Sequence, residues 1–459
     1  MGQRRVVVVG GSLAGLLAAH VLAGYADRVT VVERDRLPAE PAARPGVPQG
    51  RHAHVLLDGG QRALDALLPG FMDELRAAGS PRVGLPADLA QWDGHWFRRT
   101  EASTHIHTGT RPQLELLVRR RVLTHPAIEV VEGAEAVGLL GDAARVRGVL
   151  LRERGAGRRE EPEPLAADLV VDASGRGSRA PQWLAGLGAD APHEETIDTG
   201  LAYASRIYRD ADGRFGEHLR GFNVIADPAH PYGAVVIPLE DGTCMVTLSG
   251  LRGDEPPTGD EEFVAYAKRL AHPVVHGWLR DAEPLTPAYG FRGTANVRRR
   301  YDRPGRRPAG FLATGDALCT FNPIYGQGMS VAACNALALR DALADPRRTP
   351  TTRRVQRAVL AASARAWDIS AGSDRKMPGA QGNAVGSGVL DRPAGWYMDR
   401  LRARYGTDPV VGDPFRSVLT LVAPLTSLFA PRVARRVLFG PVLPAPAEPP
   451  LLPEDTVGR

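Results

Sequence analysis

The chain contains 459 residues, of which 43% are hydrophobic and 24% are charged, and it carries a formal net charge of +5. A chain of this length and balance can build more than one core, so we expect a multidomain enzyme rather than a disordered, fibrous or membrane-spanning protein. The positive charge comes from arginines that are scattered along the sequence, which argues against a nucleic-acid-binding module.

The first predicted unit is a strand, a glycine-rich turn, a helix and a second strand over residues 6–35. The turn, GGSLAG, matches the dinucleotide fingerprint G-x-G-x-x-G except that Ser12 replaces the second glycine. Gly10 permits a tight turn, Gly15 permits close packing of the helix on the strand, and Glu33 can accept hydrogen bonds from ribose hydroxyls. We therefore predict a dinucleotide site; the alternative is a turn with a purely structural role.

The next elements follow from composition and periodicity. Residues 36–50 are rich in proline and predict a loop, and the segment QGRHAHVLLDGGQRALDALLPG after it predicts a turn and a helix. Residues 111–124 predict an amphipathic helix with its arginines exposed. A buried strand is expected over residues 166–171, leading into DASGRGS.

From about residue 198 to 300 the pattern changes to alternation, which predicts an antiparallel sheet with a hairpin turn at Asp241-Gly242. One helix interrupts it, and the spacing of Thr258 and Glu261 predicts a capping box at its start. The parallel pattern returns at GFLATGD, so we expect a discontinuous nucleotide domain. Beyond residue 346 the chain is predicted to be helical, and residues 441–459 to form a surface tail.

A second motif, GDALCTFNPIYGQGMS at residues 315–330, lies at a predicted strand-to-helix turn. Such a turn leaves backbone N–H groups free and points the positive end of a helix outward, which suits a ring that gains negative charge. Asp316, just before the turn, can accept hydrogen bonds from the hydroxyls of a polyol.

Three motifs together, GGSLAG with Glu33, DASGRGS and GDALCTFNPIYGQGMS, resemble the signatures of FAD-dependent monooxygenases of the p-hydroxybenzoate hydroxylase and squalene epoxidase type. Within that group, RPGVPQGRHAHVLLDGG and FNPIYGQGMS look closest to bacterial flavin epoxidases of polyether polyketide biosynthesis. The resemblance implies an α/β fold: an FAD-binding Rossmann-like (GR2-type) domain, an inserted antiparallel β-sheet substrate domain and a helical C-terminal region.

The expected domain boundaries follow the alternation of these patterns. The FAD-binding domain is assigned residues 1–75, 105–180 and 300–345, and the substrate domain residues 76–104 and 181–299. Residues 346–459 form the helical C-terminal region and tail.

The resemblance also implies the ligands. FAD is the cofactor, reduced by NAD(P)H directly or by a separate flavin reductase, and molecular oxygen is the co-substrate. The implied cofactor contacts are Gly10, Gly11, Ser12, Leu13, Ala14, Gly15, Glu33, Arg34, Arg51, Arg111, Asp172, Gly175, Asp316, Pro323, Gly326, Gln327, Gly328 and Met329. The candidate substrate contacts are Tyr203, Phe222, Ile237, Met245, Phe321 and Tyr325.

The function expected from this resemblance is the epoxidation of alkenes in a hydrophobic polyketide- or terpenoid-like natural product, free or carrier-bound, by an FAD C4a-hydroperoxide. That reaction needs a dry, shaped cavity and no catalytic residue of the protein. An aromatic hydroxylase is the alternative and would need a base, for which Tyr203, Tyr232 or His105 are candidates. A flavoprotein that does not oxygenate is a third hypothesis, whereas a halogenase is disfavoured because the chain has only two lysines, Lys268 and Lys376.

The remaining residue types predict neither a metal site nor secretion. His52 and His54 have no further ligands at metal spacing, so we interpret them as structural histidines. Cys244, Cys319 and Cys334 indicate reduced thiols without a disulfide. No apolar leader precedes the first strand, and a cytoplasmic protein without a transmembrane segment is expected. Arg298–Arg300 could receive an acidic reductase, a carrier protein or a substrate carboxylate, although a solvated charge run is the simpler interpretation.

Overall fold

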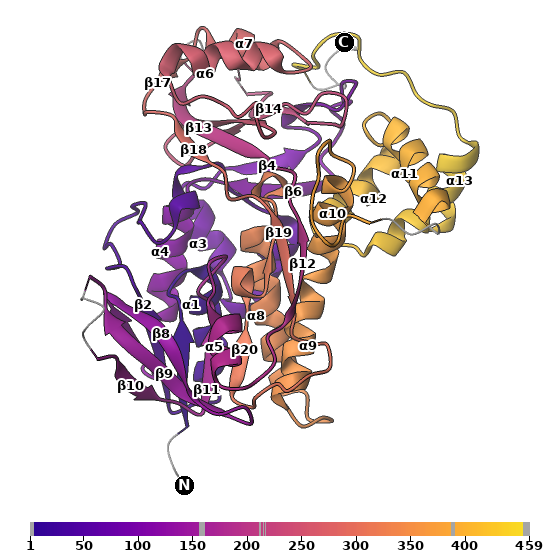
Figure 1. Cartoon of the computed structure of the whole chain (residues 1–459). Coiled ribbons are helices and arrows are strands. Elements are labelled where there is room, and N and C mark those ends of the chain that lie inside the picture. The colour runs from indigo at the N-terminus through magenta and orange to yellow at the C-terminus, as the bar shows by residue number, and fades with distance from the viewer. Residues whose placement is uncertain are drawn as a thin grey trace.

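The computed structural model describes residues 4–155, 161–210, 213, 215, 217–386 and 391–452. Three regions are visible in Figure 1: a parallel sheet flanked by helices at the bottom, a second sheet capped by two helices at the top, and a group of C-terminal helices beside them.

The parallel sheet contains β1 (Arg5–Val9), β2 (Arg28–Glu33), β7 (Ile128–Glu132), β11 (Leu169–Asp172) and β20 (Phe311–Ala313). Its strand order is β20-β11-β1-β2-β7, and every neighbouring pair is parallel. Strands far apart in the sequence therefore lie side by side, as predicted for a nucleotide domain interrupted by an insertion. The predicted strand over residues 166–171 is shorter than expected, because Ala166 ends a different strand.

Helices cover one face of this sheet, and the small antiparallel sheet that contains β8 (Ala134–Gly141) and β9 (Val146–Glu153) packs against the other face. α1 (Leu13–Ala23) connects β1 to β2 and packs against α4 (Arg111–Val122) and α8 (Gly328–Ala344). α2 (Asp58–Leu67), which confirms the helix predicted after the proline-rich loop, and α9 (Thr352–Ala362) also pack on α8. α3 (Phe71–Ala77) and α5 (Ala180–Gly186) are short.

The helix predicted over residues 111–124 is confirmed, but the exposure predicted for its arginines is wrong at Arg119 and at Arg111, whose side chain is 18% exposed. Arg119 is buried and donates a hydrogen bond to the carbonyl oxygen of Pro38. The proline-rich loop lies on this face of α4, and its free carbonyl groups satisfy the guanidinium that the loop covers.

The second sheet contains β13 (Ala202–Arg209), β14 (Gly221–Val224), β15 (Gly233–Pro238) and β16 (Cys244–Gly250), paired antiparallel. β17 (Glu283–Pro284) and β18 (Tyr289–Phe291) pair with β13, and β5 (Leu89–Trp92) adds to the other edge, parallel to β14. The predicted hairpin turn at Asp241-Gly242 joins β15 to β16, with Gly242 at a φ of 79°.

α6 (Asp260–Tyr266), a 3-10 turn (Ala267–Arg269) and α7 (Val274–Leu279) cover one face of this sheet. The predicted capping box is wrong: the helix begins at Asp260, its N-cap is Gly259, and no side chain caps it. Three acidic residues in the first turn favour the helix start in place of a cap.

Three small sheets complete the structure. They are β3 (Val55–Leu56), β6 (Thr104–Thr108) and β4 (Arg82–Leu85); β10 (Glu163–Ala166), β9 (Val146–Glu153) and β8 (Ala134–Gly141); and β12 (His193–Ile197), β19 (Asn296–Arg300) and β21 (Cys319–Thr320). The third connects the second sheet to the strand-to-helix turn before α8.

The C-terminal region contains α10 (Ala364–Asp374), α11 (Asp391–Tyr405), α12 (Pro409–Leu419), a 3-10 turn (Leu425–Phe429) and α13 (Pro431–Phe439). After α13 the chain runs without helix or strand to residue 452, held where Arg98 and Arg99 donate to the carbonyl oxygens of Pro444 and Pro450. The rest of the predicted tail, 453–459, lies outside the described residues. Over the ranges described, no helix combines the length and apolarity needed to cross a bilayer.

Candidate active site

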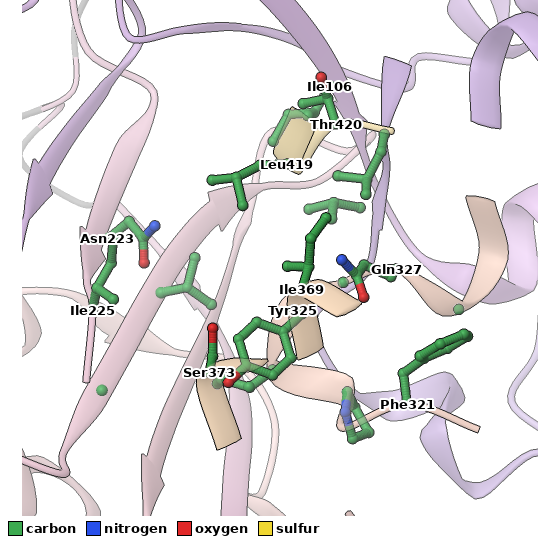
Figure 2. A pocket seen from close by; sticks show the side chains of 18 of the residues that line it. Ile106, Asn223, Ile225, Phe321, Tyr325, Gln327, Ile369, Ser373, Leu419 and Thr420 are labelled. Atoms are coloured by element: carbon green, nitrogen blue, oxygen red, sulfur yellow. The ribbon is translucent and has the colours of Figure 1, made fainter. Parts of the chain in front are cut away.

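A cavity of about 700 Å³ lies where the parallel sheet, the second sheet and the C-terminal helices meet. Its walls come from the turn after β1, from residues 321–329, from β14 and β15, and from α10, α11 and α12. In Figure 2, Tyr325 lies near the centre, with Asn223 and Ile225 on one side and Ile369, Leu419 and Gln327 around it.

Residues 321–327, which we call the α8 loop, form one end of this cavity. The side chain of Asn322 accepts a hydrogen bond from the backbone N–H of Ile324, and a 3-10 turn then leads to Gly326. Gly326 has a φ of +63°, and a Cβ there would lie 2.4 Å from Cγ2 of Val55, so this position requires glycine. α8 begins directly afterwards, and its N-terminus faces the cavity with its backbone N–H groups.

Asp316 lines the same end of the cavity. Its carboxylate has no hydrogen-bond donor among the described residues. Burial raises the pKa of this carboxyl, while the positive charges of Arg176, Arg111 and Arg299 oppose that rise. A buried carboxylate without a donor from the described residues can accept hydrogen bonds from the hydroxyl groups of a ligand.

Arg111 reaches the cavity from the start of α4. It donates to Ser12 Oγ at 3.1 Å and to Gln49 Oε1 at 3.4 Å, but its Nε is buried without a hydrogen-bond acceptor and has only an ion-pair contact of 3.9 Å with Glu115. Gln327 Oε1 is also buried without a donor. Unpaired buried groups are costly, so both atoms indicate a ligand that pairs with them. Gln49 was missed from the sequence, although it stands in the quoted segment QGRHAHVLL.

Open space at two glycines supports the same interpretation. A Cβ added to Gly175 or to Gly328 would meet no protein atom within 4 Å, although both residues line the cavity. Together with Asp316, Arg111 and Gln327, this cradle fits a flavin ring and its ribityl chain. The predicted cofactor contacts on the cavity wall are Ser12, Leu13, Ala14, Arg111, Gly175, Asp316, Pro323, Gly326, Gln327, Gly328 and Met329.

The other predicted cofactor contacts do not line this cavity: they are Gly10, Gly11, Gly15, Glu33, Arg34, Arg51 and Asp172. Gly10 and Gly15 serve the turn itself, because a Cβ at Gly15 would lie 1.8 Å from the carbonyl oxygen of Gly10. Arg34 donates to the carbonyl oxygen of Gly46, and Arg51 lies over the ring of Tyr289. Asp172 accepts hydrogen bonds from Ser174 and Ser178 and so shapes the loop after β11.

Glu33 is 4% exposed and already has three partners. It accepts from the backbone N–H groups of Gly11 at 2.8 Å and Asp35 at 2.9 Å, and it pairs with Arg44 at 3.0 Å. Arg44 also pairs with the buried Glu115. Sequence reasoning missed this buried pair, because nothing in the proline-rich loop distinguishes Arg44 from the other arginines.

Four of the six predicted substrate contacts line the cavity: Tyr203, Ile237, Phe321 and Tyr325. Phe222 and Met245 do not. Phe222 points to the other face of the second sheet, where it packs with Phe215 and the helices that cover it. Met245 lies opposite Ile237 on the neighbouring strand and packs beside it, in a cluster with Leu239.

His52 is buried beside this site, and the half-buried His54 lines the cavity. His52 Nδ1 lies 2.9 Å from Ser205 Oγ, and His54 Nδ1 lies 2.8 Å from the carbonyl oxygen of His52. Burial, aided by the charge of Arg51, lowers the pKa of His52 to about 4, and burial lowers that of His54 to about 3. No three His, Cys, Asp or Glu side chains gather at metal-binding distance in the part of the chain that is described.

The arginine run in β19 is engaged in ion pairs within the protein. Arg298 and Arg300 pair with Glu195 at 2.6 and 2.9 Å, and Arg299 pairs with Glu194 at 2.7 Å. The solvated charge run expected from the sequence is therefore wrong, because β12 places its glutamates opposite these arginines. The docking role stays a prediction.

Comparison with known proteins places the site in context. The family model for the FAD binding domain matches residues 3–373. Protein Rv3254 of Mycobacterium tuberculosis is 36% identical over 425 residues, which cover 89% of this chain and 88% of that protein. A kynurenine 3-monooxygenase of Salinispora tropica is 30% identical over 366 residues, which cover 74% of this chain and 73% of the relative.

Among solved structures, the flavin-dependent brominase Bmp2 matches with a TM-score of 0.61 at 16% identity, covering 90% of this chain and 92% of that one. A sequence identity this low supports a shared fold and nothing further. It confirms the predicted fold class, an α/β FAD-binding domain with an inserted sheet and a helical C-terminal region.

Proposed function

Because this chain belongs to the FAD binding domain family and is an FAD-dependent monooxygenase, we propose that it epoxidises one or more alkenes of a hydrophobic natural product of polyketide or terpenoid type. The observation that supports this proposal is the cavity, which continues from the α8 loop into a largely apolar space. Reduced FAD, supplied with electrons by NAD(P)H or by a flavin reductase, activates molecular oxygen for transfer.

In this proposal, the residues at the α8 loop bind the FAD cofactor. Asp316 would accept hydrogen bonds from the ribityl hydroxyls, and the N-terminus of α8 would stabilise negative charge on the flavin ring, by about 1 kcal/mol. Arg111 and Gln49, which line the same cavity as Tyr203, would help to hold the cofactor. Epoxidation of an alkene requires no proton transfer to or from any of these groups.

The residues beyond the loop orient the substrate and exclude water. Aliphatic and aromatic side chains supply most of this wall: Ile106, Ile225, Val235, Ile237, Ile369, Phe415, Leu419 and Leu428. An apolar wall favours an alkene chain over water, and its shape determines which double bond lies near the flavin.

Aromatic hydroxylation is the second candidate, and the three bases suggested for it are unsuited. Burial raises the pKa of the Tyr203 hydroxyl, which therefore stays protonated. Tyr232 bonds to Asp254, and neither it nor His105 lines the cavity. One observation nevertheless favours this candidate: Asp368 lines the cavity, burial raises its pKa, and no donor pairs with it among the described residues. The kynurenine 3-monooxygenase relative points the same way.

Purified protein distinguishes the candidates. A yellow protein with flavin absorbance is expected, and the reduced enzyme with oxygen should add one oxygen atom to a polyene and not to a phenol, as read by mass and product NMR. Oxygenation of the phenol that is lost in Asp368→Asn would establish the hydroxylase instead. A yellow protein that oxygenates neither compound would support the third hypothesis, a flavoprotein that does not oxygenate.

A further inference from the structure

One face of α11 runs along the cavity. Ala394, Met398, Arg402 and Tyr405 all line it, and their spacing of three and four residues places them on one side of the helix. Ala394 is exposed and Tyr405 is buried. The face therefore leads from solvent into the protein, with the half-buried Arg402 between the two ends.

Arg402 differs from the other cations on the cavity wall. Arg111 bonds to Ser12, Lys376 pairs with Asp399 at 3.5 Å, and Arg416 pairs with Asp413 at 2.6 Å. Arg402 has no hydrogen bond and no ion pair with any residue that the structure describes.

Asp93 lines the cavity near the buried Tyr405 and accepts a hydrogen bond from its hydroxyl. It forms no ion pair with Arg402. Burial raises the pKa of both Tyr325 and Tyr405, and the charge of Arg402 opposes that rise in each. Arg402 therefore lines the cavity close enough to Tyr325 and Tyr405 for its charge to act on both hydroxyls. A half-buried cation without a partner is costly unless a ligand supplies the counter-charge.

We propose that Arg402 binds a carboxylate of the substrate, so that the substrate is a free acid with an apolar body and not a carrier-bound thioester. A guanidinium presents paired N–H donors that match the two oxygens of a carboxylate. The inference rests on the proposed function, since it takes this cavity as the substrate site. It makes Arg402 a specificity-determining residue that orients the chain relative to the flavin.

The test measures binding to the full-length, FAD-loaded protein without turnover. Four acids serve as probes: decanoate, 10-undecenoate, 4-phenylbutanoate and all-trans-retinoate. Each is compared with its primary amide and its N-acetylcysteamine thioester, by titration calorimetry and by the change in flavin absorbance.

At least one acid should bind ten-fold or more tightly than both of its neutral partners. Arg402→Gln should reduce that ratio to within two-fold while the neutral probes bind as before, and Arg402→Lys should keep part of it. Equal binding of acids and amides across the panel, absence of binding, or a preference that survives Arg402→Gln would overturn the proposal. Loss of the preference in Lys376→Gln instead would assign the carboxylate to Lys376.

The two proposals fail separately. A carboxylate preference in a protein that never oxygenates an alkene would leave this inference standing and reject the epoxidase. Epoxidation of an alkene by a protein that shows no preference for carboxylates would support the epoxidase and reject this inference.

Discussion

The hydroxyl of Tyr325 donates a hydrogen bond of 2.6 Å to Oδ1 of Asp374, which joins the α8 loop to α10. Oδ2 of the same carboxylate accepts from Asn322 at 3.0 Å and from Asn296 at 2.6 Å. Asn296 in turn accepts from Ser370 and from the backbone of Asn322. The α8 loop is thus fixed by the C-terminal region as well as by its own turn.

Removing this carboxylate should destabilise the protein. Asp374 is 2% exposed, and Asp374→Ala leaves two buried donors, Asn296 and Asn322, and the half-buried Tyr325 hydroxyl without this acceptor, which should cost about 3 kcal/mol of unfolding free energy in urea. Tyr325→Phe removes one bond and should cost about 1 kcal/mol. Tyr25→Phe is the control, because Tyr25 is 40% exposed. Equal stability of the Asp374→Ala and Tyr25→Phe variants would contradict a structural role for the network.

Local patterns were enough to predict the parts of the fold that local forces determine. The first strand-turn-helix-strand unit and the hairpin turn at Asp241-Gly242 both follow from residues close together in the sequence. Alternation also predicted the inserted antiparallel sheet, but not which face of each strand meets the cavity. Both faces of that sheet are covered, one by α6 and α7 and the other by the cavity, so Phe222 and Asn223 could not be assigned to a side.

Contacts between distant segments account for what the sequence did not reveal. Arg119 is buried because a separate loop lies over α4, and Asp374 meets Asn296 only through tertiary packing. Arg402 lies in a region without a recognisable motif, and nothing near it in the sequence distinguishes it from the other arginines. The glycines and Asp316 were recognisable because a close backbone approach and a free carboxylate restrict the residue type.

Asp316→Ala should weaken FAD retention and abolish turnover. The carboxylate is an unpaired acceptor on the cavity wall, so its loss removes hydrogen bonds to the ligand and none within the protein; a ten-fold or greater rise in the FAD dissociation constant, about 1.4 kcal/mol, is expected. Flavin content after gel filtration and fluorescence titration measure the effect. Asp341→Ala, on the exposed side of α8, is the control. Unchanged flavin content would remove Asp316 from the cofactor site.

Stability should fall in mild acid because His52 is buried. His52 has a pKa of about 4 in the folded protein, lowered from 6.5 mainly by burial, so the unfolded chain binds more protons below pH 6.5. The stabilisation is complete above pH 6.5 and is lost as the pH falls towards 4, with about 2 kcal/mol lost by pH 5. Urea unfolding between pH 5 and 7.5 should show a shallower slope for His52→Gln and an unchanged slope for His230→Gln, whose side chain is exposed. Parallel curves for the wild type and His52→Gln would refute this assignment.

Two glycines of the same segment should respond in opposite ways to alanine. Gly326→Ala is strained by its positive φ and by Val55, so it should lower the unfolding free energy by about 2 kcal/mol and reduce FAD binding as a consequence. Gly328→Ala meets no protein atom and lies in the first turn of α8, so the apoprotein should be as stable as wild type or slightly more so. Its methyl group enters the cradle, however, and FAD affinity should fall ten-fold or more. Melting of the apoprotein and FAD titration separate the two effects, and a Gly328→Ala variant that binds FAD normally would show that the flavin does not lie against the N-terminus of α8.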